Sequence, residues 1–413
     1  MKKQLFNEQP LITCYPEYSL LFSLAGNKIN NWIATELLQV RVTPQIGFVG
    51  FCEHENLFNR CPFILREEKS AESFSDKKEG LIDLVISSVD ANKCLFLYMD
   101  RFYIDGLEEY KGIHYIHKSI VVGYDTDERC IYIADNFSKG RFQVVSCKYA
   151  DFLQACCFDT KIHVLDSVLT DNYQGRLCDY VEHLIKDNGK AFVYVNRKLI
   201  GNLHCEETLA HELEIVGVNP KDKTFDVVYR YGLLNKKVKC SFDELEKAYI
   251  KDIRKELLCS IDVISQKADD SAVPDRQTMI EKLKSYLDSK GEDHSQTLYE
   301  NYFGIEAEQY LYLWIARNGS FRMKIFHFLF EHKLLMELRV NMLVELGLIS
   351  SDSAIISEVA ELKKRFFMLR NIAIKYIVSR SKDDLSYLLE KFEAAIDTDM
   401  SFCKKLVEEL EGT

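Results

Sequence analysis

Two residue types that can share a proton, a histidine and an aspartate, bracket a predicted β-hairpin. His117 opens an apolar run that ends at Asp125, and a second run from Cys130 ends at Asp135 and Asn136. Because antiparallel strands of similar length bring their far ends together, we expect His117 and Asp135 to lie at the same end of the hairpin. An imidazole beside a carboxylate is the base and the orienting group of a nucleophilic triad. The pair therefore predicts a general base for a nucleophile elsewhere in the chain.

Cys14 is the candidate nucleophile, because it stands at the start of a predicted helix. Pro16 falls where the first turn would begin, apolar residues follow at helical spacing, and Gly26 ends the pattern. The dipole and the free backbone N–H groups of a helix N-terminus stabilise a thiolate, and such N–H groups can also form an oxyanion hole. The alternative is a buried cysteine that caps an ordinary core helix. Position alone leaves both interpretations open.

Other groupings of metal-ligand residue types predict no site. Cys52-Glu53-His54-Glu55 and His114-Tyr115-Ile116-His117 lack a partner pair at the spacing of a structural zinc site. The sequence also contains no phosphate-binding loop and no Gly-x-Gly-x-x-Gly pattern. We therefore predict neither a metal nor a bound cofactor.

The composition predicts a globular protein of two or three domains. The chain has 413 residues, of which 47% are hydrophobic and 28% are charged, enough for sizeable cores. Its formal net charge of −11 argues against a nucleic-acid-binding protein, which would carry a basic stripe. The 13 cysteines include no Cys-x-x-Cys pair and are predicted to be reduced thiols. No stretch is apolar enough for a signal peptide or a membrane span, so we predict a cytoplasmic protein.

An internal repeat follows the hairpin, since residues from about 76 to 157 recur at about 172 to 250. The run that begins at His117 corresponds to the run that begins at His211, whereas Asp135 is matched by Tyr229. No equivalent of the Cys14 helix precedes the second copy. We interpret the second copy as a degenerate half-repeat that extends the first sheet or walls one side of a substrate cleft.

The predicted fold class is α+β, with three domains. The first covers residues 1–160, the half-repeat at 161–265 packs on it, and an all-helical domain covers 275–413. A charged loop is expected at 66–78 and a linker at 265–277.

Apolar residues at three- and four-residue spacing predict the helices of the last domain, near 275–290, 296–316, 320–347, 353–379 and 382–411. Within the fourth run, Lys363-Lys364-Arg365 and Arg370 form a basic cluster. Such a cluster is either a docking face for an acidic partner or the solvated side of a helix.

The order of these features resembles the papain-like superfamily. Cysteine lies on an N-terminal helix, His117 opens a strand that ends in Gly-Tyr-Asp, and Asp135 closes the next strand. The most similar branches are the double-glycine (bacteriocin-processing) peptidases and the N-terminal domain of the butirosin biosynthesis protein H family. In the C-terminal region, the stretch from Arg322 to Arg339 looks similar to the second domain of that family. Papain-like enzymes place an oxyanion-hole glutamine about six residues before the cysteine; here Gln9 lies five before Cys14.

The resemblance implies a papain-like first domain with a Cys14–His117–Asp135 triad and Gln9 as an oxyanion donor. It further implies an acyltransferase that moves an acyl group from a carrier-protein thioester, through acyl-Cys14, to an amine in natural-product (antibiotic) biosynthesis. The acyl donor would be carried on the phosphopantetheine of an acyl or peptidyl carrier protein, and the acceptor would be a small amine. A cysteine peptidase or thioesterase of the same fold, and a non-catalytic papain-like binding protein, stay as alternatives. A homodimer is also left open.

Overall fold

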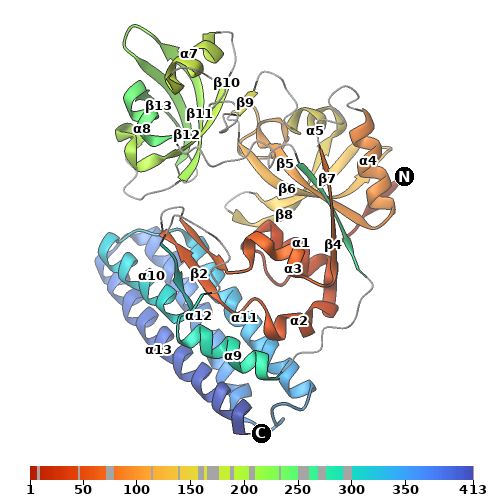
Figure 1. Ribbon diagram of the computed structural model, residues 1–413, viewed down its shortest axis with the longest axis vertical. Coiled ribbons are helices and arrows are strands. Elements are labelled where there is room, and N and C mark those ends of the chain that lie inside the picture. Colours follow the sequence, from red (N-terminus) through yellow and green to blue (C-terminus); the bar gives the residue numbers. More distant parts are fainter. Residues whose placement is uncertain are drawn as a thin grey trace. The chain divides into compact units, whose positions relative to one another are not determined.

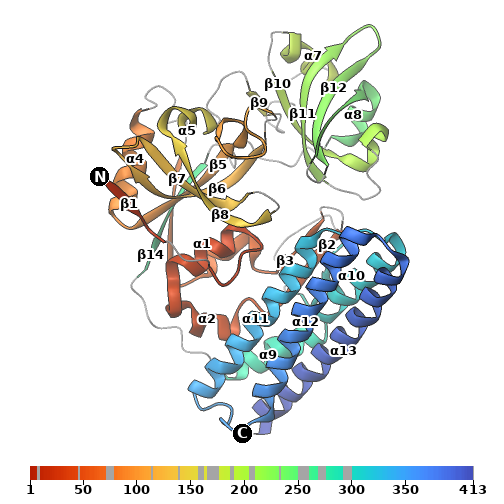
Figure 2. The same cartoon turned by 180° about the vertical axis from the view of Figure 1, so that it is seen from behind.

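The computed structural model describes the following parts of the chain: residues 1–6, 10–44, 47–70, 79–112, 115–137, 140–156, 162–164, 176–186, 190–203, 210–231, 234–249, 260–267, 276–291 and 300–412. They belong to two compact units. The sheet unit comprises 1–8, 44–47 and 66–265, and the helical unit comprises 9–43, 48–65 and 266–413. Figures 1 and 2 show the elements of both units from opposite sides.

The first sheet of the sheet unit has seven strands, in the order β4-β14-β5-β6-β7-β8 with β1 paired to β6. Two helices belong to this half, α4 (Glu79–Asp90) and α5 (Tyr149–Ala155). The strands are β1 (Lys2–Gln4), β4 (Ile64–Ser70), β5 (Lys93–Asp100), β6 (Ile116–Asp125), β7 (Cys130–Asn136), β8 (Phe142–Lys148) and β14 (Ser260–Gln266).

One face of this sheet carries its hydrophobic core. Side chains alternate between the two faces of a strand, so Leu95, Leu97 and Met99 of β5 all point the same way. They pack with Val85 of α4 and Phe152 of α5 in a single buried cluster. Both helices therefore cover the same face of the sheet.

Strand β4 lies where the sequence predicted a charged loop beginning at residue 66, so that prediction is wrong for residues 66–70. The charges are compatible with a strand because β14 supplies a buried carboxylate. Asp262 accepts 2.8 Å hydrogen bonds from Arg66 Nε and from Lys118 Nζ of β6. Charged side chains are common on edge strands, where they oppose further pairing.

The second sheet has the order β13-β12-β11-β10-β9. Its elements are β9 (Ile162–Val164), α7 (Leu177–Lys186), β10 (Lys190–Asn196), β11 (Ala210–Asn219), β12 (Thr224–Tyr231), β13 (Leu234–Ser241) and α8 (Phe242–Ala248). From α7 to α8 their order repeats the order from α4 to α5, with a helix, four strands and a helix. Among the described residues the second copy forms a sheet of its own, so the expectation that it extends the first sheet is wrong. That it packs on the first half stays a prediction.

The two halves also share a strand register. Val121 of β6 pairs with Ile133 of β7, and 94 residues later Ile215 of β11 pairs with Val227 of β12. An irregularity follows at the same place, before Gly123 in one half and Gly217 in the other. The two hairpins therefore have turns of the same length and a bulge at the same position.

The helical unit contains the helices predicted for the C-terminal region: α9 (Arg276–Leu287), α10 (Gly304–Asn318), α11 (Met323–Glu345), α12 (Ala354–Ser379) and α13 (Lys382–Gly412). The N-terminal part of the chain adds α1 (Pro16–Ala25), α2 (Asn30–Thr35), α3 (Leu57–Arg60) and a small sheet. That sheet has the order β15-β2-β3, from Tyr302–Phe303, Val40–Thr43 and Phe48–Phe51. The predicted α+β class, with antiparallel sheets before a helical region, is confirmed at this level.

Residues 9–43 and 48–65 thus group with the C-terminal helices, whereas the sequence placed them in a domain of residues 1–160. Side chains of α11 account for this grouping. Arg339 Nη2 donates to the backbone carbonyls of Ile33 at 2.9 Å and Glu36 at 2.8 Å, and a His332 Nε2–H donates to Leu38 O at 2.9 Å. These contacts join residues about 300 positions apart, and sequence periodicity carries no information about them.

Lys333 is fully buried beside two carboxylates. Its ammonium group donates to Asp399 Oδ2 at 2.7 Å, Glu308 Oε1 at 3.0 Å and His332 Nδ1 at 2.9 Å. The Tyr286 hydroxyl donates to the same oxygen of Asp399 at 2.6 Å. A buried charge is tolerated only when it is paired and hydrogen-bonded in this way.

Glu53 predicts an unusual pH dependence of stability. Burial, followed by the nearby Glu36 carboxylate, raises its pKa to about 7, and its Oε2 is buried without a hydrogen-bond partner among the described residues. Since the carboxyl holds its proton more tightly in the folded state, the wild type loses stability as the pH rises from about 4.5 to about 7. We expect Glu53→Gln to remove this loss, with a gain of about 3 kcal/mol over wild type at pH 8.

Urea unfolding of both proteins at pH 5 and pH 8 measures the effect. An exposed control, Glu67→Gln, should leave the pH dependence as it is, because surface ion pairs contribute little. Equal pH dependence in wild type and Glu53→Gln would contradict the assignment.

Candidate functional site

His117 and Asp135 lie together in the sheet unit, as the hairpin predicted. His117 is on β6 and Asp135 on β7, and the His117 Nδ1 lies 2.9 Å from Asp135 Oδ2. Asp135 is fully buried, whereas the His117 side chain is 34% exposed. The ionised carboxylate is only an acceptor, so Nδ1 is the donor in this contact, and in the neutral imidazole the lone pair is then on Nε2. This orientation is the one a general base requires.

The Asp135 carboxylate is held by four hydrogen bonds. Oδ2 accepts from His117, from Arg101 Nη2 at 2.8 Å and from Ser119 Oγ at 2.5 Å, and Oδ1 accepts from the backbone N–H of Asn136 at 2.6 Å. Burial alone raises the pKa of this carboxyl, but His117, Arg101 and the Ser119 hydroxyl together hold the pKa below its usual range. Asp135 is therefore an ionised group fixed in one orientation.

Arg101 is a residue of this site that sequence reasoning did not single out. Its guanidinium is buried between the rings of Tyr115 and Phe137, each 5.0 Å from the Arg101 Cζ, and its Nη1 lies 3.5 Å from Glu109 Oε1. The guanidinium balances the buried carboxylate and fixes its position. The signal available in the sequence was the repeat, because the second copy also has an arginine after the matching strand, Arg197.

The second copy keeps the arginine but has no carboxylate for it at this position. Arg197 lies over the ring of Tyr229, with its Cζ 5.6 Å from the ring centroid, and Tyr229 occupies the place of Asp135. The Tyr229 hydroxyl donates to Leu203 O at 3.3 Å. Leu213, fully buried, stands where Ser119 stands in the first copy. The side chain of His211 lies outside the described residues.

Cys14 belongs to the helical unit, just before α1. It is buried, and its backbone N–H donates to Glu331 Oε2 at 2.9 Å. Glu331 Oε1 accepts from the backbone N–H of Thr13 at 2.6 Å and from its hydroxyl at 2.8 Å, and it lies 3.1 Å from His327 Nε2. The backbone donor expected to serve an oxyanion is thus bonded to a carboxylate of α11.

The same carboxylate acts on the Cys14 thiol. Burial and then the negative charge of Glu331 raise the pKa of the thiol well above its ordinary value. A thiol in this state is protonated at neutral pH, in contrast to the thiolate that a helix N-terminus predicts. Gln9, the predicted oxyanion donor, lies outside the described residues.

The structure therefore brings His117 and Asp135 together. Cys14 belongs to the other compact unit, so its role as the nucleophile of this pair stays a prediction. Among the described residues, no group of three His, Cys, Asp or Glu side chains could hold a metal ion. No helix in the described part of the chain is long and apolar enough to cross a membrane.

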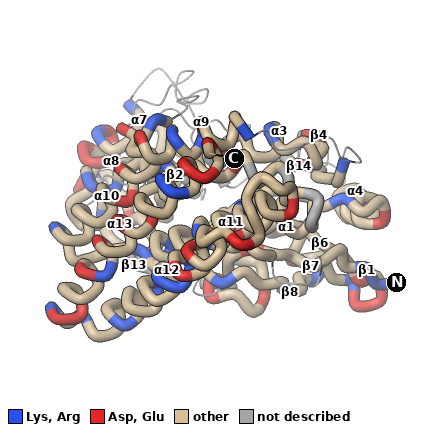
Figure 3. The backbone as a smooth tube through the Cα atoms, turned by 90° about the horizontal axis from the view of Figure 1, so that it is seen from below, with Lys and Arg blue, Asp and Glu red and all other residues tan. Residues whose placement is uncertain are grey.

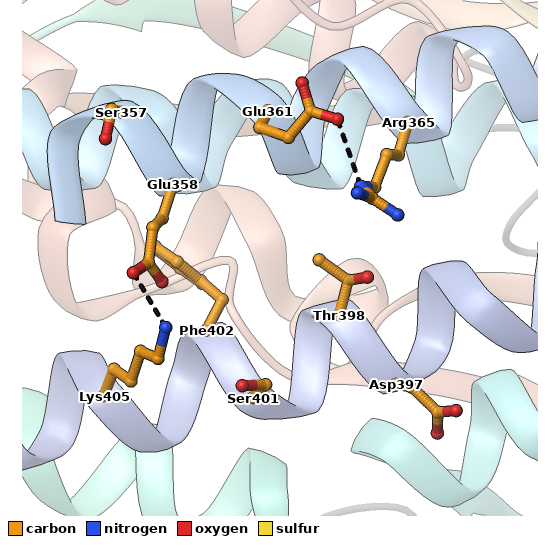
Figure 4. Close-up of a pocket in the computed structure, with 9 residues that line it drawn as sticks. All are labelled: Ser357, Glu358, Glu361, Arg365, Asp397, Thr398, Ser401, Phe402 and Lys405. Atoms are coloured by element: carbon orange, nitrogen blue, oxygen red, sulfur yellow. Dashed lines mark hydrogen bonds and ion pairs between the residues drawn. The ribbon is translucent and has the colours of Figure 1, made fainter. Parts of the chain in front are cut away.

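A groove of about 490 Å³ runs between α12 and α13 of the helical unit (Figure 4). Four of its five charged side chains form two ion pairs, and Asp397 belongs to neither pair. Glu358 Oε1 lies 2.8 Å from Lys405 Nζ, and Glu361 Oε1 lies 3.2 Å from Arg365 Nε. The residues that line the groove include hydroxyl groups but no cysteine and no histidine that could activate them, so the groove offers no candidate chemistry.

Comparison with known proteins gives no family. No protein-family model matches the chain, and no curated protein matches it either. The functional conclusion therefore depends on the residues of the site itself.

Replacing Asp135 by asparagine is expected to destabilise the sheet unit by about 3 kcal/mol at pH 7, because it removes the nearer of the two carboxylates beside the buried Arg101 guanidinium and leaves only Glu109. The pKa of Asp135 is lowered by folding, so its contribution is complete above about pH 4 and is lost as the pH falls below that value. The difference in the free energy of unfolding between wild type and Asp135→Asn should therefore become smaller as the pH approaches about 2. Urea unfolding across this range tests it, with Asp127→Asn, an exposed position, as the matched control.

Replacing Glu331 by glutamine is expected to lower the pKa of the Cys14 thiol, because a negative charge beside it disappears. Alkylation of Cys14 by iodoacetamide at pH 7.5, followed by peptide mass mapping, should be about three- to tenfold faster. Glu337→Gln, on the same helix but paired with Lys363 at 2.6 Å, is the control. An alkylation rate of Cys14 in Glu331→Gln that equals the wild-type rate and depends on pH in the same way would show that Glu331 does not raise the pKa of the thiol.

Proposed function

We propose that this protein is a cysteine-dependent acyltransferase with a papain-like Cys14–His117–Asp135 triad. The reaction would transfer an acyl group from a carrier-protein thioester, through acyl-Cys14, to an amine acceptor in natural-product biosynthesis. The observation that carries the proposal is the His117–Asp135 pair, in which a buried, ionised carboxylate orients a half-exposed imidazole. The order of cysteine, histidine and aspartate along the chain, with its resemblance to papain-like enzymes, supports it.

The chemistry follows from the roles of these groups. His117 accepts the thiol proton of Cys14 as the sulfur attacks the thioester carbonyl, and the pantetheine thiol leaves with that proton. The incoming amine then attacks acyl-Cys14, His117 takes the amine proton, and the Cys14 thiol regains it as the amide departs. Because the pKa of the thiol is raised, proton transfer during the attack is favoured over a preformed ion pair. Asp135 stabilises each imidazolium that forms.

A hydrolytic version of the same triad, a cysteine peptidase or thioesterase, differs only in using water as the acceptor. The driving force of the transferase is the stability of the amide, since exchange of one thioester for another changes the free energy little. The products therefore distinguish the two, as an amide in one case and a free acid in the other.

A non-catalytic binding protein is the second candidate, and one observation favours it. Glu331 holds the backbone N–H of Cys14 and raises the pKa of its thiol, both of which oppose nucleophilic catalysis. In that case the His117–Asp135 pair would be a structural ion pair together with Arg101.

The test is covalent labelling of the full chain with octanoyl-pantetheine, read by intact mass. We expect one acyl adduct that is lost in Cys14→Ala and retained in Cys52→Ala, a matched cysteine of the same unit. His117→Gln should slow adduct formation by about 10²–10⁴-fold, the usual contribution of a general base. Adding 1,3-diaminopropane should release the octanoyl amide.

Other outcomes are equally informative. An adduct on Cys52 or Cys61 would move the nucleophile, and release of octanoic acid in the presence of the amine would favour the hydrolase. Absence of any adduct with short and long acyl thioesters would leave the binding protein as the better description.

A further inference from the structure

The solvent-facing side of α12 carries an apolar stripe. Phe367, Ile374 and Val378 are spaced by seven and four residues and so lie on one face of the helix. All three are exposed, Val378 by 81%. The opposite face of α12 packs into the helical unit through residues such as Leu369 and Tyr376. The three residues of the stripe are therefore apolar side chains of α12 that do not belong to the core of the helical unit.

Arg370 borders this stripe and has no acidic partner among the described residues. Its Cζ lies 5.0 Å from the ring centroid of Phe330 on α11 and 5.1 Å from that of Phe367. Its Nε is buried without a hydrogen-bond partner among these residues. Two aromatic neighbours restrict the plane of a guanidinium, which presents donors suited to a carboxylate.

The charged residues that α12 itself contributes along the stripe are all basic. Residues 362–380 contain six Lys or Arg and no Asp or Glu, in a chain whose net charge is −11. Some of these cations are neutralised locally, as Lys363 is by Glu337 and Lys375 by Asp384; Arg370 and Arg380 are not, among the described residues. Figure 3 shows the backbone with all Lys and Arg positions in blue and all Asp and Glu positions in red.

We propose that the α12 face, defined by Phe367, Arg370, Ile374 and Val378, binds an acidic amphipathic helix of a partner protein. Apolar residues of that helix would cover Phe367, Ile374 and Val378, and one of its carboxylates would pair with Arg370. Phenylalanine and arginine are enriched in protein interfaces, and arginine is frequent among the residues that dominate binding energy. This proposal does not depend on the acyltransfer chemistry.

Two other occupants fit less well. A symmetric dimer through this face would place Arg370 and its neighbouring cations opposite their own copies, which costs Coulomb energy. Insertion of α12 into a lipid surface would bury a broad apolar face of the helix, and the exposed stripe is only one residue wide. The largest buried side chains of α12 instead face α11 and α13 within the unit.

The test uses the full chain and a fluorescein-labelled, 18-residue helical peptide with a leucine stripe flanked by glutamates. We expect micromolar binding by fluorescence anisotropy at 50 mM NaCl, weaker at 300 mM NaCl because of screening. Arg370→Gln and Val378→Asp should each weaken binding at least about tenfold. Val378→Asp is less able than Arg370→Gln to disturb folding, since Val378 is the most exposed apolar residue of the stripe.

Lys404→Gln, on α13, removes one positive charge elsewhere and is expected to bind like wild type. A peptide of the same composition with its leucines scattered should bind more weakly than the striped one. Equal binding by wild type, Arg370→Gln and Val378→Asp would overturn the proposal. So would Val378-dependent co-sedimentation with phosphatidylserine vesicles in the absence of peptide binding, or a dimer in sedimentation equilibrium that Val378→Asp dissociates.

Discussion

Helix α11 supplies the charged side chains that satisfy the backbone of the N-terminal segment, and the helical unit depends on this. Glu331 accepts from the N–H groups of Thr13 and Cys14, while Arg339 donates to carbonyls of Ile33 and Glu36. A segment of short helices has many backbone groups without intrahelical partners, and burying them unpaired would cost about 1–3 kcal/mol each. The segment therefore folds against α11, which supplies the missing partners.

This dependence explains which parts of the fold the sequence predicted. The C-terminal helices and the hairpin from His117 to Asp135 follow from local periodicity and turn spacing, and both are present. Strand β4 was predicted as a loop because charge normally marks exposed chain; it is a strand because Asp262, almost 200 residues later, neutralises Arg66. Pairings of this kind, like those of α11, depend on which distant residues meet, and no periodicity encodes that.

The two halves of the sheet unit offer a comparison within one chain. Both keep the helix–strand order, the register of the central hairpin and a buried arginine. In the first half Arg101 pairs with an ionised carboxylate that also binds a histidine; in the second, Arg197 lies against the ring of Tyr229. A scaffold therefore does not require the carboxylate at this position. In the first half, His117 and Ser119 both donate to this carboxylate. A proton-transfer role for His117 would account for a carboxylate that the stability of the fold does not require.

The Cys14 N–H is the point where stability and the proposed chemistry compete. A hydrogen bond to a charged acceptor contributes about 1.5–3 kcal/mol, so an acyl oxyanion would have to displace the Glu331 carboxylate and recover at least that much. An oxyanion carries a full negative charge and would compete with Glu331 for the Cys14 N–H. The neutral carbonyl of a bound thioester would be too weak an acceptor to displace it. The hydrogen bond to Glu331 would then stabilise the folded segment until the transition state forms. The Cys14 N–H would bind the oxyanion of the transition state but not the carbonyl of the substrate. If Cys14 has no catalytic role, the same bond is simply the N-terminal cap of the segment, and its loss would affect stability alone.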